Sequence, residues 1–168
     1  MNIEKLIIEI IPPSDYQHRN GFNNIPIIDN LTDKEKKQVI GLLIEKLLYK
    51  KNEEIDILIV ETLAYLKSKE SLPVLKNLLE NCSNELDKLK IATSIFEINH
   101  DNDMVDMAIT SLKKIDDKND SYYVHKLTSS FYYLIKFNKP EVNRIIHEYI
   151  NHKEYLVSYN AKRALGIL

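Results

Sequence analysis

The side chains most able to bind a metal or act in catalysis are few in this sequence. They are one cysteine, Cys82, and five histidines, His18, His100, His125, His147 and His152. His147 and His152 are five residues apart, a spacing that points two side chains in different directions on a helix, so a paired-histidine metal site is not expected. A single cysteine cannot build a cysteine-based zinc site, and a chain with three glycines has no phosphate loop. We therefore expect no catalytic residue, no metal and no cofactor.

The charge balance gives no general attraction to nucleic acid or anionic lipid. The 23 basic and 25 acidic side chains leave a formal net charge of −2. Lysine pairs such as Lys113-Lys114 fall near expected helix ends, where lysine interacts favourably with the helix dipole. Nucleic-acid binding would therefore require a local basic patch.

Length and composition indicate one soluble domain. The chain has 168 residues, 44% of them apolar and 29% charged, as in ordinary globular proteins. The first eleven residues carry two glutamates and lack the basic region and cleavage site of a signal peptide. No apolar run reaches the ~18 residues that a membrane span needs. With one cysteine, the chain fits a reducing compartment, and we expect a cytoplasmic protein.

Helical periodicity begins at the N-terminus and resumes after a long connection. Residues 3–11 form a short amphipathic pattern that ends at Pro12-Pro13. Residues 12–31 then read as a loop, and loops of that length are usually functional or packed. Thr32 followed by Glu35 is a capping box, so a helix is expected over 32–52.

From residue 53 onward, helical patterns come in pairs joined by short turns. The expected pairs are 53–67 with 71–81, 84–99 with 103–114, and 121–137 with 139–151, followed by an unpaired helix over 155–168. Equivalent core positions are Leu63, Ile95, Phe131 and Leu165, separated by 32, 36 and 34 residues. This period is typical of helix-pair repeats.

The sequence therefore predicts an all-α fold, a right-handed α-α superhelix of about eight or nine helices. Residues 1–168 form a single domain in this interpretation. Its parts are an N-terminal helix and loop cap (1–31), a first capping helix (32–52) and the helix-pair repeats (53–168).

Two segments resemble a known repeat family. Ala161, Ala164-Leu165-Gly166 and Leu168 resemble the first-helix pattern of short HEAT repeats, and the segment 72–79 resembles the second-helix pattern. The resemblance covers about residues 53–168 and is to small bacterial HEAT-repeat (armadillo-like) proteins, which implies a helical solenoid. Tetratricopeptide repeats share the period, but the Trp, Gly and Tyr positions of their pattern are absent.

In such a solenoid one helix of each pair lies on the convex side and the other on the concave side, where extended partners usually bind. We expect the second helices to line the concave side. Aligning the core positions Leu43, Leu78, Ala108 and Ile145 then defines a predicted partner-binding row. Its members are Leu42, Glu45, Asn77, Glu80, Met107, Thr110, Arg144 and His147.

Tyrosine is concentrated in the C-terminal part, where seven of the ten fall within residues 122–159. Tyrosine gives large contact area at little entropic cost, so Tyr132, Tyr155 and Tyr159 are candidate partner anchors. We expect Tyr149 to be buried and Tyr132 to face solvent on the convex side. The last helix has no second helix to cover it. It is expected to form a homodimer interface, to bind a partner, or to lie flat against the preceding pair.

Two classes of function remain. The first is a non-enzymatic scaffold or adaptor that binds a protein or peptide partner on its concave surface. The family resemblance implies, more narrowly, an immunity or neutralising protein. The alternative is a HEAT-type nucleic-acid-binding or base-repair protein, which would need a basic concave groove with aromatic side chains. The charge of the groove separates the two, because lysines and arginines would favour the alternative and acidic residues such as Glu45 and Glu80 would oppose it.

Overall fold

The protein is built from helices throughout the part described by the computed structural model, residues 3–49 and 55–168, in which no strand occurs. Its α-helices are α1 (Ile3–Ile10), α2 (Tyr16–Arg19), α3 (Ile25–Asp29), α4 (Asp33–Tyr49), α5 (Ile57–Tyr65), α6 (Leu72–Asn81), α7 (Glu85–Asn99), α8 (Asp103–Ile115), α9 (Tyr123–Leu134), α10 (Pro140–His147) and α11 (Tyr155–Ala164). Two short 3₁₀ helices, η1 (Lys69–Ser71) and η2 (Ile135–Phe137), lead into α6 and extend α9.

The predicted all-α class is confirmed, but these residues hold eleven α-helices, more than the eight or nine expected. The difference lies in the segment 12–31, which was expected to be a loop and contains the short helices α2 and α3. Two predicted boundaries, the end of the 32–52 helix and the start of the 53–67 helix, extend into residues 50–54 and lie outside the described residues. Within the described ranges, no helix is both long and apolar enough to cross a membrane.

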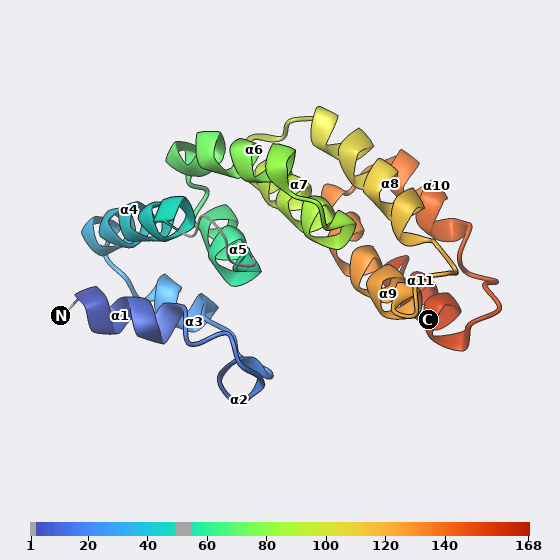
Figure 1. The fold of residues 1–168 in the computed structure, drawn as a ribbon, viewed down its shortest axis with the longest axis horizontal. Helices are drawn as coiled ribbons and strands as arrows, with labels where there is room; N and C mark the ends of the chain where they lie inside the picture. Colours follow the sequence, from blue (N-terminus) through green and yellow to red (C-terminus); the bar gives the residue numbers. More distant parts are fainter. Residues whose placement is uncertain (1–2, 50–54) are drawn as a thin grey trace.

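The helices form an arch (Figure 1). Along its inner side α5, α7, α9 and α11 pack one against the next, while α6, α8 and α10 lie along the outer side. The N-terminal helices α1, α3 and α4 close one end, and α11 closes the other. The inner helices are therefore the first members of the helix pairs.

Helix α7 is the centre of the core. It contacts α5, α6, α8 and α9, and its residues 91–96 are all buried. The helix begins at Asn84, whose side-chain oxygen accepts hydrogen bonds from the backbone of Leu86 and Asp87, and it ends at His100 in the left-handed conformation (φ 57°). A helix with neighbours on every side needs apolar or small residues at consecutive positions, which explains why α7 has no wide polar face.

The capping box predicted at Thr32 and Glu35 is present in the structure. Thr32 Oγ1 accepts a hydrogen bond from the backbone N–H of Glu35 (3.3 Å), and the Glu35 carboxylate accepts one from the backbone N–H of Thr32 (2.9 Å). This is the predicted capping box at the start of α4.

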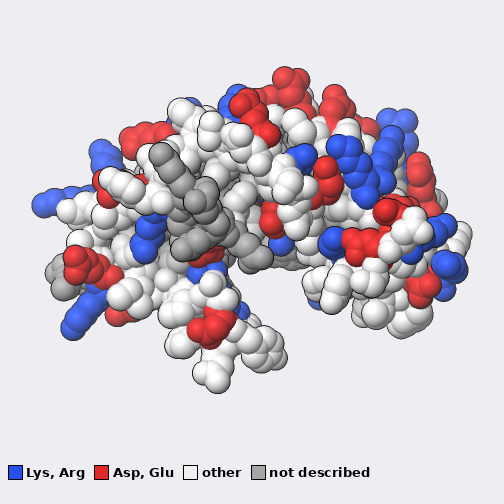
Figure 2. All heavy atoms as spheres, viewed as in Figure 1, with Lys and Arg blue, Asp and Glu red and all other residues white. Residues whose placement is uncertain are grey.

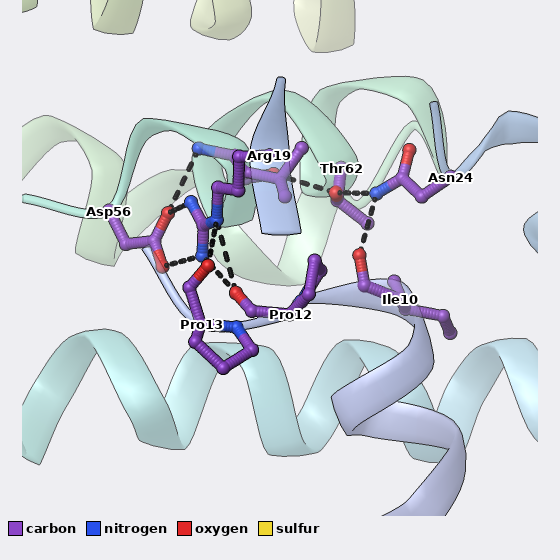
Figure 3. Close-up of polar contacts among 8 residues, drawn as sticks. Ile10, Pro12, Pro13, Arg19, Asn24, Asp56 and Thr62 are labelled. Carbon is purple, nitrogen blue, oxygen red and sulfur yellow. Dashed lines mark hydrogen bonds and ion pairs between the residues drawn. The ribbon is translucent and has the colours of Figure 1, made fainter. Parts of the chain in front are cut away.

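The segment between α1 and α4 is tied to the start of α5 by an arginine. The Arg19 guanidinium donates to both carboxylate oxygens of Asp56, at 2.6 and 2.8 Å, and to the backbone carbonyl of Pro12 (Figure 3). Asp56 is also the N-cap of α5, because its side chain accepts from the backbone N–H of Leu58. One carboxylate thus caps a helix and holds a segment 37 residues distant.

A buried asparagine makes the second tie. The side-chain amide of Asn24 donates to the Ile10 carbonyl (3.2 Å) and to Thr62 Oγ1 (2.8 Å), which itself donates to the Leu58 carbonyl (Figure 3). Asn24 and Thr62 are both buried, so their hydrogen bonds satisfy polar groups that would otherwise be costly. These contacts place the α2–α3 connection against α5.

Candidate binding groove

A cavity of about 410 Å³ lies on the inner side of the arch, between the α2–α3 connection, α5, α7 and the end of α9. Phe22, Asn23, Asn24 and Ile25 form one wall, and Tyr132 and Lys136 form the opposite one. Figure 2 shows an indentation on the corresponding lower side, between the lobe that carries α2 and the lobe that carries α9 and α11. The tethered segment thus supplies a wall of this cavity.

A second cavity, of about 330 Å³, lies between α9 and α11. Phe131, Ile135 and Ala164 give it apolar lining, and Arg163 and Asn160 line it from α11. Tyr132 belongs to the lining of both cavities, and its side chain is 65% exposed. We refer to the two cavities together, joined at Tyr132, as the inner groove.

Both lysines of the first cavity interact with Glu97. Lys67 Nζ donates to the backbone carbonyl of Glu97 (2.7 Å), and Lys136 Nζ lies 3.4 Å from the Glu97 carboxylate. Lys136 also lies over the rings of Tyr132 and Tyr133, 5.6 and 5.4 Å from their centroids. The charge of Lys136 is therefore offset by the Glu97 carboxylate and by aromatic faces, and this part of the groove is not a basic channel.

Tyr133, the neighbour of Tyr132 on α9, contacts the Tyr132 ring edge to face. Burial raises the pKa of its phenol strongly, and the nearby Glu61 carboxylate, to which the phenol donates a hydrogen bond, raises it further. Lys90 lies 5.6 Å from the centroid of the same ring. The Tyr133 phenol thus stays neutral, and the Glu61 carboxylate accepts its hydrogen bond.

Tyr65 links the groove wall to α3. Its hydroxyl donates to Asp29 at 2.7 Å, and this hydrogen bond, more than burial, raises the pKa of Tyr65. Among the tyrosines that line the groove, Tyr65 is therefore committed to the protein itself. Tyr132 has no such hydrogen-bond partner among the described residues, so its hydroxyl and one ring face are open to a ligand.

The predicted partner-binding row does not line the groove. All eight members are on α4, α6, α8 and α10, none belongs to the lining of either cavity, and all but the half-buried Leu42 are exposed. The expectation that second helices line the inner side was wrong, because the first helices pack closely in succession while α6, α8 and α10 lie outside them. Asn77, Glu80, Met107, Thr110, Arg144 and His147 therefore lie on the outer side, and Leu42 and Glu45 lie on α4 at the N-terminal end.

Among the predicted aromatic anchors, Tyr132 faces solvent as expected, but it lines the inner groove and does not lie on the convex side. Tyr155 and Tyr159 are exposed on α11, and their rings are 5.8 Å apart. The expectation for Tyr149 is confirmed, as it is buried with its hydroxyl donating to Asp116. Cys82 is buried at the end of α6, where burial raises the pKa of its thiol.

Several groove residues were not singled out from the sequence, notably Glu61, Tyr65, Glu97 and Arg163. They lie on the first helices α5, α7 and α11. The available signal was the unbroken run of apolar and small residues over 91–96 in α7, which marks a helix enclosed by neighbours. Because α7 is a first helix and is enclosed in this way, the first helices, and not the second helices, lie along the inner side of the arch.

In the described ranges no cluster of three or more histidine, cysteine or acidic side chains is arranged to hold a metal ion. No protein-family model, curated protein or solved structure significantly matches the chain. The groove geometry therefore carries the functional argument.

Proposed function

We propose that this protein is a non-enzymatic binding module that holds an extended peptide or protein segment in the inner groove, with Tyr132 as the central anchor. The proposal includes the finer architecture, a right-handed HEAT-like superhelix, whose repeated helix pairs provide one continuous surface. A protein that neutralises a single partner is the narrower form of the same proposal.

The observation that carries it is the position of Tyr132. This side chain separates two adjoining cavities, belongs to the lining of both and is largely exposed. An exposed aromatic between two hollows can contact successive side chains of an extended chain. Lys136, held against the Tyr132 ring, favours one ring orientation and lowers the entropy lost on binding.

The charges favour a peptide over a nucleic acid. The lining of the first cavity contains as many carboxylates, Glu61 and Glu97, as lysines, and Lys136 is paired with Glu97. Figure 2 also shows acidic and basic side chains interspersed over the visible face. A phosphate backbone would require several unpaired cations in series.

A displayed library of random peptides, selected on the full chain, tests the proposal. We expect selection to enrich a related set of peptides containing an apolar or aromatic residue. Binding of these peptides should fall at least about tenfold in Tyr132→Ala, as expected for an anchor worth more than about 1.4 kcal/mol.

Met107→Ala is the matched control, because Met107 is an exposed large apolar side chain on the outer side. It should leave peptide binding unchanged. If the library yields no enriched peptide, or if Met107→Ala reduces binding while Tyr132→Ala does not, the inner groove is not the binding surface.

A further inference from the structure

Arg163 differs from the other charged residues of the inner groove in lacking a partner. Lys67 and Lys136 interact with Glu97, and Glu61 accepts from Tyr133. Arg163, in the last turn of α11, is exposed and forms no side-chain hydrogen bond or ion pair within the described residues. It is therefore the one guanidinium of the groove lining that is free to bind an anion there.

The surface beside Arg163 is apolar. Phe131, only 1% exposed, lies under the cavity, with Ile135 and Ala164 around it and Tyr132 at the boundary with the first cavity. At about 330 Å³, the space exceeds the volume of a large side chain. An apolar hollow next to a free guanidinium is complementary to an apolar side chain with a carboxylate next to it.

We propose that the cavity between α9 and α11 receives an apolar side chain of the bound peptide, and that Arg163 pairs with an acidic residue adjacent to it. The inference rests on the proposed peptide-binding function and names the chemistry of the partner. The planar guanidinium presents a fork of donors that matches one carboxylate. Since Arg163 is a single cation beside an otherwise neutral lining, it suits a carboxylate better than a run of phosphates.

Charge reversal tests the inference. Three pools of synthetic peptides carry one central Leu, Phe or Tyr next to Glu, Gln or Lys, with other positions randomised, and binding to the full chain is measured by fluorescence anisotropy. We expect the Glu pool to bind at least about tenfold more tightly than the Lys pool, in the range measured for close charge pairs. Arg163→Glu should reverse this order.

Arg144→Glu is the matched control. Arg144 is also exposed and in the last turn of its helix, α10, but it lies outside the groove. Arg144→Glu and Arg163→Glu make the same charge change at equivalent positions of their helices. A change in binding caused only by net charge or by the helix dipole would therefore appear in both variants. The order of the three pools should be unchanged in Arg144→Glu, and far-UV circular dichroism should show both variants helical.

The outcomes separate this inference from the function on which it rests. If the pools bind and Tyr132→Ala abolishes binding, but the preference for Glu is absent or survives Arg163→Glu, the acidic-partner inference is overturned and peptide binding stands. If no pool binds, both are overturned. If single-stranded DNA or RNA binds instead and Arg163→Glu removes that binding, the partner is a nucleic acid and the inference is wrong.

Discussion

The two walls of the inner groove are held in place by different physical means. The N-terminal wall is the α2–α3 connection, and between residues 12 and 24 only Pro12 and Asn24 are buried. Hydrogen bonds and one bidentate ion pair attach this wall to α5. The C-terminal wall is formed by α9 and α11, which pack through buried apolar residues including Leu127, Phe131 and Val157.

The difference indicates what each wall can tolerate. Burial of apolar area is non-directional and survives small shifts, whereas a bidentate pair and a buried amide fix one orientation and fail when a single atom is removed. The N-terminal wall is therefore positioned accurately by few contacts, and the C-terminal wall is stabilised by many weak ones. Mutations in the two walls should differ in the size of their effect.

The largest effect is expected in the C-terminal wall. Phe131 is almost fully buried and its ring packs 5.2 Å from that of Tyr149. Phe131→Ala should lower the free energy of unfolding by about 3–5 kcal/mol, because the lost burial is accompanied by a cavity. Chemical denaturation measures this, with the adjacent exposed residue as control: Tyr132→Ala should change stability by less than about 0.5 kcal/mol. Similar losses in both variants would show that α9 is rotated from its assigned orientation.

The next effect is expected at the tether of the N-terminal wall. Asp56→Ala removes both the N-cap of α5 and the partner of Arg19, and should cost about 2–3 kcal/mol of unfolding free energy. Asp56→Asn retains a good N-cap but not the charge, so it should cost less and isolate the ion pair. Arg19→Lys keeps the positive charge but cannot make the bidentate contact, so it should also lower the free energy of unfolding. Denaturation midpoints for all three variants check these values, and an unaffected Asp56→Ala would mean that this tether contributes nothing.

Much of the fold could be predicted from the sequence because helical periodicity is local. Of the four assigned equivalent core positions, Leu63, Ile95 and Phe131 are essentially fully buried, whereas Leu165, just after the end of α11, is half-buried. The capping box at Thr32 was also read from two residues in one turn. Both signals arise within a single helix, where spacing alone determines which side chains share a face.

The side of the arch on which a helix lies could not be predicted in the same way. Periodicity identifies the buried face of each helix, but the inner or outer position depends on the rotation between successive pairs. That rotation is set by many contacts between helices. The predicted row from Leu42 to His147 was therefore internally consistent and still placed on the wrong side, and Tyr132 was misplaced for the same reason.

The N-terminal wall was hidden for a different reason. Arg19 and Asp56 are 37 residues apart, and Asn24 and Thr62 are 38 apart, with no periodic pattern connecting them. A polar contact between such distant residues leaves no local signal in one sequence. The length of the 12–31 connection was the available hint, because long connections are usually packed or functional.

Alkaline pH should act mainly on the C-terminal side. Burial raises the pKa of Tyr133 and Tyr149 far above the ordinary value near 10. Above pH 10 the unfolded chain loses these protons while the folded chain keeps them, so stability present below pH 10 is lost as pH rises. Each phenol can contribute at most about 1.4 kcal/mol per pH unit.

Tyr133→Phe and Tyr149→Phe should therefore flatten the fall of unfolding free energy between pH 10 and 11, measured by denaturation at each pH. The wild-type slope is the reference for both variants. A slope that neither substitution changes would mean that the two phenols are accessible to water in the folded protein.

The smallest effect on stability is expected on the free side of the C-terminal wall. Tyr155 is 74% exposed and Leu156 56% exposed in the first turn of α11, and Tyr159, one turn further, is also exposed. Replacing Tyr155 with Ser and Leu156 with Gln should change the free energy of unfolding by less than about 0.5 kcal/mol, since little burial is lost. Exposed apolar side chains on adjacent positions are typical of an interface, and a homodimer through α11 is the predicted use. Sedimentation velocity at two concentrations should show an increasing average mass for the wild type and a monomer for the double variant. A wild type that stays monomeric at both concentrations would leave these side chains without a role in self-association, and the groove between the two walls would be the protein's principal binding surface.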